Sequence, residues 1–501
     1  MVAALLLWAA YPPHGETFAV LVALVPMLVV ARLVPARRSA LAFFAVGAVF
    51  WVLSLSWMPA IVKNNGPWPL VVLGWFALAA LCASYFAVFG FAVSWLWGAR
   101  RRDGAFAVPS AVCAFGEAFA WAILEYLRAT LFTGFAWNFL GTSFAAMPSF
   151  AAPARFGGVY LVSALIVLLN GVFATLLIRA LSPAFGWTGR FAVAAPSLRR
   201  RLVQLAETGL PLAFILGCLV VGNRMVREGM QACASSPVHL RVALVQRNAP
   251  CCFKPGRRED AYEAFGSLID AVAAAKPDLV VLAESAMAEF GAVRSFRAQD
   301  VARGFLSRAG ARALMAGGDD TVEGRAYNAV ALYGRRGDLL KTYHKQHLVP
   351  FGEYIPLDKW ITPLQKLSPV GVSLHPGAPE LFEIATADGH ALKVAPLICY
   401  EDTDPRLAAK AKRMGADLIV LVTNDSWFSC SAEAEAHAAQ AVLRAVETGL
   451  PIVRVGNSGV TGVIRPDGRA RWLSDASGRP LVDAPGVMVE TLQILTKGDG
   501  R

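Results

Sequence analysis

The sequence predicts a polytopic α-helical membrane domain followed by a layered α/β domain, and three observations support this fold class. Hydrophobic residues make up 56% of the 501-residue chain and charged residues only 17%, whereas charged residues average about 25% in globular domains. Only five acidic residues occur before residue 226. Short apolar runs alternate with helical patterns from about residue 238. We therefore expect a membrane domain over residues 1–225, a linker over 226–237, an α/β domain over 238–490 and a tail over 491–501.

The expected membrane domain contains apolar stretches long enough to cross a bilayer, which takes about 20 residues. An N-terminal stretch, VAALLLWAA, is apolar but only about half that length. The six candidate spans are residues 17–34, 40–61, 69–97, 105–127, 159–181 and 207–223.

Basic residues are concentrated in alternate loops of this domain: around residue 35, over 98–104 and over 183–203. Cytoplasmic loops of membrane proteins carry such an excess of Lys and Arg. The last span then runs outward, so the α/β domain is expected on the periplasmic side of a bacterial inner membrane. This topology also explains the net charge of +11. Because no RNA- or DNA-binding motif is present, no nucleic-acid partner is expected.

Three charged residues, Glu117, Glu125 and Arg128, fall within or just after one candidate span, and two explanations stay open. Charges at membrane depth are costly and indicate function by default. Alternatively, Glu125 and Arg128 form an i,i+3 pair at the membrane interface. The following stretch, LFTGFAWNFLGTSF, is typical of a re-entrant or surface-lying loop.

The second half shows the patterns of strands and helices in turn. A period of two in HLRVALVQR predicts a strand, and a helix is expected at about 257–275. The long amphipathic run 432–449 predicts a second helix that ends at Gly449. Strands alternating with helices predict a layered α/β domain. The further strands are expected in residues 278–284, 311–318, 327–334, 391–399, 416–425 and, as a pair, 451–468.

Three polar residues lie at or just beyond the ends of these strands. Glu284 closes DLVVLAE, Cys399 closes VAPLIC, and Lys345 follows the strand and turn at 327–338. Ligands of open α/β sheets bind at the carboxyl ends of strands. A carboxylate, an ammonium and a thiol gathered there suit acyl transfer, in which they act as base, oxyanion stabiliser and nucleophile.

The residues after Cys399 favour an exposed sulfur, although most buried cysteines merely fill a core. Asp404 is suited to cap a helix and Pro405 to begin it. A strand, a tight turn and a helix start present a side chain as a nucleophile elbow does. The neighbouring carboxylates Glu401 and Asp402 oppose formation of a thiolate, and a lysine partner would offset them.

Several motifs together resemble those of the nitrilase, or carbon–nitrogen hydrolase, superfamily. HLVPFGEYIP preceded by a basic residue, CYED, TNDSWF and HAAQAVLRAVETGLPIVRVGNSGVTGVIRPDG resemble more specifically the apolipoprotein N-acyltransferase family, in which a nitrilase domain follows a multi-span membrane domain. The resemblance covers nearly the whole chain. It implies that the α/β domain is an αββα sandwich with a Glu–Lys–Cys triad.

The resemblance also implies roles for particular residues. It makes Glu284 the general base, Lys345 the oxyanion-stabilising lysine and Cys399 the nucleophile. Glu353 matches a second glutamate that orients the lysine and nearby polar groups. The remaining matches follow the nucleophile or line the site and its lid: Tyr400, Glu401, Asn328, Trp427 and Phe428. For the last three the alternatives stay open, a turn residue for Asn328 and ordinary core for the two aromatic residues.

Two local departures from the family pattern are visible. The triad glutamate of the family usually follows Trp-Pro, whereas here it lies in LAES. The family usually has glycine after the Trp-Phe pair, where this chain has Ser429 and Cys430. The first departure predicts a less rigid strand end at Glu284, and the second leaves the backbone of the lid open.

The resemblance implies an acyltransferase that takes an acyl chain from a phospholipid, forms a cysteine thioester and acylates the amine of a diacylglyceryl-cysteine in an apolipoprotein. The expected partners are therefore these two substrates and the lipid bilayer, and the chain is expected to act as a monomer. One alternative is a membrane-anchored amidase or nitrilase that hydrolyses small amides with the same triad. A transporter or ligand-binding sensor is the other, and the absence of paired broken-helix repeats disfavours it.

No metal or organic cofactor is expected. The eight cysteines include no CxxC pair and have no metal-like spacing to histidine. His344 and His347 are three residues apart, but no third ligand is evident, and both are interpreted as loop residues. A disulfide framework is not indicated.

Overall fold

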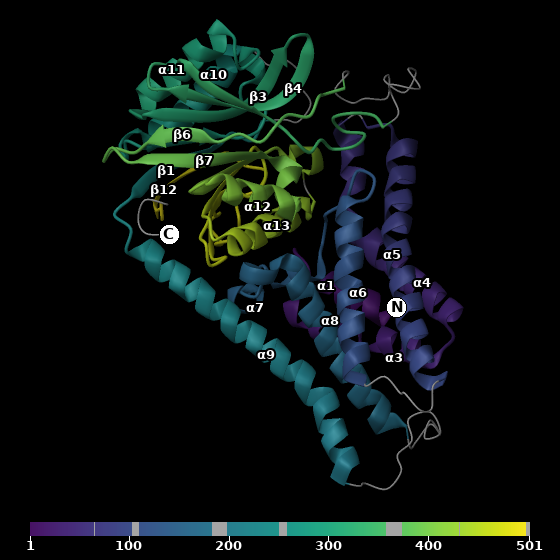
Figure 1. The fold of residues 1–501 in the computed structure, drawn as a ribbon. Helices are drawn as coiled ribbons and strands as arrows, with labels where there is room; N and C mark the ends of the chain where they lie inside the picture. Colours follow the sequence, from purple (N-terminus) through teal and green to yellow (C-terminus); the bar gives the residue numbers. More distant parts are fainter. Residues whose placement is uncertain are drawn as a thin grey trace. The chain divides into compact units, whose positions relative to one another are not determined.

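The computed structural model describes residues 1–64, 66–102, 110–182, 198–249, 258–356, 373–429 and 431–496 (Figure 1). The chain divides by internal contacts into two compact units. Unit 1 contains Met1–Pro59 and Trp68–Met225, and unit 2 contains Ala60–Pro67 and Val226–Arg501. Residues 226–234 of the expected linker continue a long helix, α9 (Leu198–Ala234). The four-part division of the chain stays a prediction.

Unit 1 is built from helices. Among the described residues, five helical segments are long and apolar enough to cross a membrane: Ala36–Asn64, Trp68–Gly98, Ser110–Thr130, Ala154–Leu181 and Leu205–Ala234. They correspond to five of the six spans expected from the sequence. The helices of this part of the chain are α1 (Val2–Ala9), α2 (Val20–Ala23), α3 (Val25–Leu33), α4 (Ala36–Ser54), α5 (Trp68–Arg102), α6 (Ser110–Thr130), α7 (Pro148–Ala151), α8 (Ala154–Leu181) and α9, with 3₁₀ turns η1 (Thr17–Ala19), η2 (Met58–Asn64) and η3 (Leu140–Phe144).

The sixth expected span, residues 17–34, differs from the prediction. The apolar helical stretch there covers only Thr17–Leu33 and is divided among η1, α2 and α3. Pro26 lies in the first turn of α3, where its missing N–H does not break a helical hydrogen bond. The same proline cannot continue a helix from the preceding residues. The stretch is therefore broken into short pieces instead of forming one long helix.

A buried ion pair joins α3 to α6 in unit 1. Arg32 donates to both carboxylate oxygens of Glu117, at 2.9 and 2.5 Å, and both side chains are fully buried. Trp97 on α5 also donates to Glu117, at 2.6 Å, while Arg32 donates to the hydroxyl of Thr175 on α8 at 2.9 Å. Buried charges are stable only when paired and hydrogen-bonded. For Glu117, the structure therefore favours the structural explanation, because its charge is balanced inside the helix bundle.

Glu125 and Arg128 stabilise the irregular segment that follows α6. Glu125 accepts from Trp121 Nε1 at 2.9 Å and from the backbone N–H of Leu140 at 2.7 Å. Arg128 donates to the backbone carbonyls of Phe135 and Trp137, at 2.8 and 2.7 Å. Buried backbone without helical hydrogen bonds needs such partners. Both side chains therefore bond to this loop, and these hydrogen bonds go to partners other than each other.

Unit 2 contains two six-stranded mixed sheets. Strands β1, β2 and β3 of the first sheet run parallel to one another. Strands β7, β8 and β9 of the second sheet do the same. The first sheet has the order β12 (Gly486–Gln493), β1 (His239–Gln246), β2 (Leu279–Leu282), β3 (Ala313–Val322), β4 (Arg325–Gly334) and β5 (Leu339–His344). The second has the order β11 (Ala470–Trp472), β10 (Gly462–Ile464), β9 (Ile452–Gly456), β8 (Leu418–Thr423), β7 (Ala391–Ile398) and β6 (Phe382–Ala385).

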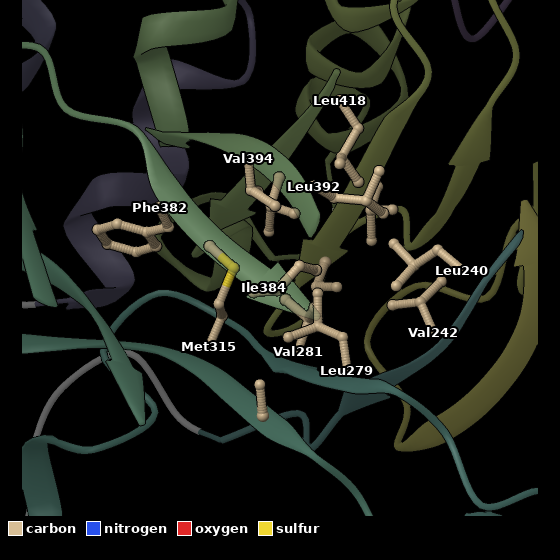
Figure 2. Packing of buried hydrophobic residues seen from close by; sticks show 14 of the residues in the cluster. Leu240, Val242, Leu279, Val281, Met315, Phe382, Ile384, Leu392, Val394 and Leu418 are labelled. Atoms are coloured by element: carbon tan, nitrogen blue, oxygen red, sulfur yellow. The ribbon is translucent and has the colours of Figure 1, made fainter. Parts of the chain in front are cut away.

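The two sheets pack face to face between pairs of helices, which gives the expected αββα sandwich (Figure 1). Helices α10 (Arg258–Ala273) and α11 (Phe296–Ala309) cover the first sheet, and α12 (Pro405–Met414) and α13 (Glu433–Thr448) lie beside the second. Alternate residues of a strand point to opposite faces. Leu240 and Val242 accordingly enter the core between the sheets (Figure 2), whereas Ala243 and Val245 pack beneath α10 and α11.

Strands with buried apolar runs were predictable from the sequence, and edge strands were not. The expected strands correspond to β1, β2, β3, β4, β7, β8, β9 and β10. The prediction missed β5, β6 and β11, which lie towards sheet edges, and β12, which continues beyond the expected domain end at residue 490. β12 pairs antiparallel with β1. Residues 497–501 of the expected tail lie outside the described residues.

The core between the sheets gives the first testable prediction. Leu418 is fully buried on β8 (Figure 2), so Leu418→Ala should lower the free energy of unfolding by about 3 kcal/mol through lost apolar burial and a residual cavity. Leu340→Ala is the matched control, because Leu340 lies on β5 with 54% exposure, and its cost should stay within about 0.5 kcal/mol. Thermal unfolding of the full chain in detergent measures both. Equal destabilisation by the two variants would contradict the packing described.

Candidate active site

The three residues expected to act together follow three different strands. Glu284 comes after β2, Lys345 directly after β5 and Cys399 directly after β7, as the first residue of the 3₁₀ turn η7 (Cys399–Thr403). Strands β2 and β5 belong to one sheet and β7 to the other. The carboxyl ends of these strands therefore bring together residues that are up to 115 positions apart in the sequence.

Lys345 is the centre of a buried charged group. Its ammonium lies 2.9 Å from Oε1 of Glu353 and 3.9 Å from Oε1 of Glu284, and its side chain is 1% exposed. Asn328 on β4 donates to the same two carboxylate oxygens, at 2.7 Å for Glu284 and 2.8 Å for Glu353. Glu353 also accepts from the backbone N–H of Val349 at 2.8 Å. Asn328 is thus a bridge between two acids, not merely a turn residue.

These contacts set the protonation of the group. Burial by itself would lower the pKa of Lys345, but attraction to Glu353 and Glu284 outweighs it and raises the pKa, so the ammonium stays charged. Burial raises the pKa of Glu284, and the charge of Lys345 opposes this rise. Burial and the nearby Glu284 charge raise the pKa of the Cys399 thiol, again opposed by Lys345. The group therefore combines a thiol with a nearby carboxylate whose proton affinity is increased, which suits a proton acceptor.

Cys399 has the strained backbone of an elbow. Its φ is +51°, a value that residues with a Cβ rarely adopt. The helix after it begins as expected: the Asp404 side chain accepts from the backbone N–H of Arg406 at 2.9 Å, and Pro405 is the first residue of α12. Such strain persists only where surrounding contacts enforce it, and it is concentrated at functional sites. Cys399 is only partly buried and packs against the core between the sheets; its nucleophilic role stays a prediction.

Glu401 joins η7, called here the nucleophile turn, to the residues just after Lys345, called here the lysine loop. Its carboxylate accepts from the backbone N–H groups of Ile398 at 2.8 Å, Gln346 at 2.6 Å and His347 at 3.1 Å. The hydroxyl of Tyr343 on β5 donates to both oxygens, at 2.9 and 2.7 Å. Glu401 thus fixes the residue before Cys399 to the two residues after Lys345. Its two carboxylate oxygens are thus occupied by hydrogen-bond donors.

The aromatic residues expected at the site belong to the two 3₁₀ turns that follow β7 and β8. Tyr400, Trp427 and Phe428 are half-buried, and the last two belong to the 3₁₀ turn η8 (Asp425–Phe428). Asn64, from the segment Ala60–Pro67 of unit 2, donates to the backbone carbonyl of Trp427 at 2.9 Å. No sequence pattern indicates this contact. Cys430, expected in the lid, lies outside the described residues.

A second buried ionic cluster lies next to the nucleophile, and sequence reasoning missed it. His437 on α13 contacts Asp402 of η7 at 3.0 Å through Nε2 and Asp425 of η8 at 2.9 Å through Nδ1. Arg454 on β9 contacts the other oxygen of Asp425 at 3.1 Å. The available signal was a histidine on the apolar face of the helix 432–449 and two aspartates placed shortly after strands.

Among the described residues, one group combines ligand types that zinc uses. The sulfur of Cys399, a carboxylate oxygen of Asp425 and a ring nitrogen of His437 lie within 4.8 Å of one another. Each ring nitrogen of His437, however, already faces a carboxylate, and these charges raise its pKa well above the usual range despite burial. A protonated imidazole cannot bind a metal. We assign the group to an ion-pair cluster.

One further expectation about histidines needs correction. His344 is the last residue of β5, not a loop residue, and its Nε2 lies 2.7 Å from Asp320. His347 does lie outside the strands, with Nδ1 3.6 Å from Asp404.

Comparison with known proteins gives matches to both parts of the chain. The family model described as apolipoprotein N-acyltransferase N-terminal domain matches residues 3–172, and the carbon-nitrogen hydrolase model matches residues 241–479. An apolipoprotein N-acyltransferase of Allorhizobium ampelinum is 32% identical over 422 residues, which are 81% of this chain and 70% of that protein. One of Geobacter metallireducens is 29% identical over 480 residues, 94% of this chain and 85% of that protein. Among solved structures, an amidase from Nesterenkonia sp. is 19% identical with a TM-score of 0.38, covering 52% of this chain and 93% of that one.

The contacts of Glu401 give the second prediction. Glu401→Gln replaces an acceptor-only carboxylate by an amide whose NH₂ faces backbone N–H donors, so it should lower the free energy of unfolding by about 3 kcal/mol. Glu380→Gln is a matched control, since Glu380 pairs with Lys341 at 2.7 Å with both side chains at least 40% exposed, and exposed pairs contribute little. Thermal unfolding of both variants tests this. An unchanged unfolding temperature in Glu401→Gln would show that these bonds do not hold the two loops together.

Proposed function

The chain belongs to the apolipoprotein N-acyltransferase family and is an acyltransferase; from this premise we propose that it moves an acyl chain from a phospholipid to an apolipoprotein through a thioester on Cys399. The observation that carries the proposal is the buried ammonium of Lys345 between Glu284 and Glu353, in electrostatic contact with the Cys399 thiol. Base, cation and nucleophile are the three groups that acyl transfer through a covalent intermediate needs.

In the first half-reaction, Glu284 takes the proton of the Cys399 thiol. The thiolate attacks the carbonyl carbon of a phospholipid ester, and the carbonyl oxygen becomes an oxyanion that the Lys345 ammonium stabilises. The tetrahedral intermediate then breaks its bond to the glycerol oxygen, which receives the proton from Glu284. The products are a thioester on Cys399 and a lysophospholipid.

In the second half-reaction, the acceptor is the α-amine of a diacylglyceryl-cysteine at an apolipoprotein N-terminus. The amine nitrogen attacks the thioester carbonyl and passes a proton to Glu284, and Lys345 again stabilises the oxyanion. Breakage of the carbon–sulfur bond releases the N-acylated product, and the Cys399 sulfur recovers a proton from Glu284. Glu353 and Asn328 hold Lys345 and Glu284 in place throughout.

The membrane domain suits such substrates, because both are anchored in lipid. Its alternating basic loops support an orientation in the bacterial inner membrane with the catalytic domain facing the periplasm. Residues 103–104 and 183–197 of the two later basic loops lie outside the described residues. No cofactor takes part in the proposed reaction, and one chain supplies all of its named residues.

The acyl intermediate is the direct test. We expect mass spectrometry of purified enzyme, incubated with phospholipid of defined acyl chain, to find that acyl group on the peptide containing Cys399 and lysophospholipid in the medium. Cys399→Ala should lose the modification completely while keeping the unfolding temperature. An acylated Cys399→Ala enzyme would show that another residue is the nucleophile.

The same incubation, repeated with small amides, separates the proposal from hydrolysis of such amides, the activity class suggested by the carbon-nitrogen hydrolase match. Release of ammonia from small amides, with no lysophospholipid formed, would favour that alternative.

The pKa of Glu284 predicts a pH dependence. Because burial raises this pKa, the carboxyl gains a proton at a higher pH than an ordinary glutamate and can then no longer accept the thiol proton. The single-turnover acylation rate should therefore fall about tenfold per pH unit below that pKa. Glu284→Gln should reduce the rate by at least about a hundredfold and remove this acid limb. An unchanged limb in the residual activity of Glu284→Gln would assign it to another group.

A further inference from the structure

The buried cluster beside the nucleophile has no part in the proton transfers described above. It contains His437, Asp402, Asp425, Arg454 and Glu433, all at most 3% exposed. Glu433 lies one turn before His437 on α13, with its Oε1 3.6 Å from the ring. Burying five ionisable side chains is costly unless their charges balance. The free-energy cost of burying these side chains beside Cys399 suggests that the cluster has a role there.

The His437 side chain connects two turns, the nucleophile turn η7 and the aromatic turn η8. One ring nitrogen contacts Asp402, three residues after Cys399 in η7, and the other contacts Asp425, the first residue of η8 with Trp427 and Phe428. Asp425 is also held by the hydroxyl of Thr423 at 2.7 Å. A neutral imidazole donates through only one nitrogen. Facing two carboxylates, the ring is therefore an imidazolium.

The charges of the cluster balance only with that imidazolium present. Asp402 and Asp425 contribute two negative charges, and His437 and Arg454 contribute two positive ones. Burial and the charge of Asp425 raise the pKa of Glu433 to about 8, which favours its neutral form. Loss of the positive charge on His437 would leave the cluster with one net negative charge. The Cys399 sulfur lies within 4.8 Å of a carboxylate oxygen of Asp425 and a ring nitrogen of His437, so this negative charge would disfavour a thiolate.

We propose that His437 is a positioning residue, whose imidazolium holds the nucleophile turn against the aromatic turn and, together with Arg454, cancels the two negative charges that Asp402 and Asp425 place beside Cys399. This inference rests on the proposed role of Cys399 as nucleophile. It explains how the thiol stays reactive although an aspartate lies three residues away in the same turn. The charge of Glu401 is stabilised by backbone N–H groups, and the charge of Asp402 is balanced by His437.

Reactivity of the thiol tests the charge role without requiring acyl transfer. The full chain in detergent is treated with iodoacetamide at several pH values, and carbamidomethylation of Cys399 is followed by peptide mass spectrometry. In His437→Gln the rate should be about ten- to thousandfold lower at each pH below the thiol pKa, since one nearby charge moves a pKa by one to three units. The amide keeps a polar side chain of similar size at this position.

The double variant Asp402→Asn/His437→Gln is the matched control. It removes one charge of each sign, so the cluster is again neutral and the rate should return towards that of the unchanged enzyme. A merely structural role would make the double variant no faster than His437→Gln. That outcome, or an unchanged rate in His437→Gln with an unchanged unfolding temperature, would overturn the proposal. If phospholipid leaves no acyl group on Cys399 while the alkylation pattern holds, the proposed reaction fails and the charge role of His437 stands.

Discussion

The site depends on one buried ammonium. Lys345 lies between Glu284 and Glu353 in a place where water is almost absent, and without these carboxylates its charge would not survive there. Because the lysine remains charged, it can oppose the effect that burial and Glu284 have on the thiol of Cys399. The carboxylates, in turn, are kept in register by the amide of Asn328. Removing the ammonium would leave two buried carboxylates without their counter-charge.

The nucleophile turn shows how strain and charge are balanced around this centre. Cys399 has a positive φ, which the bonds of Glu401 to Ile398 and to the lysine loop enforce. One acid of CYED thus acts through the backbone, and the next, Asp402, is paired with His437. Neutral N–H and O–H donors stabilise the carboxylate of Glu401, and His437 pairs with Asp402. Their presence is therefore compatible with a reactive sulfur.

The helical unit follows the same physical rule in a more apolar setting. Arg32 and Glu117 neutralise each other inside the helix bundle, whereas Glu125 and Arg128 bond to the backbone of the loop that follows α6. In the sequence, these residues differ from functional intramembrane charges in no visible way. Their partners are more than 80 residues distant in the first case and are main-chain atoms in the second. Neither type of partner leaves a pattern that a single sequence can reveal.

The sequence by itself determined the two-part organisation, most strands of the sandwich cores and the strand ends at which Glu284 and Cys399 lie. These features follow from local rules: apolar runs of a given length and period, and polar residues where such runs end. Only the tertiary structure decided that β12 pairs with β1, that Pro26 divides one apolar stretch, and that His437 joins two turns. These depend on contacts between residues far apart in the chain, or on competition between close alternatives. The free energy of such contacts is fixed by burial and mutual distance, which the order of residues does not display.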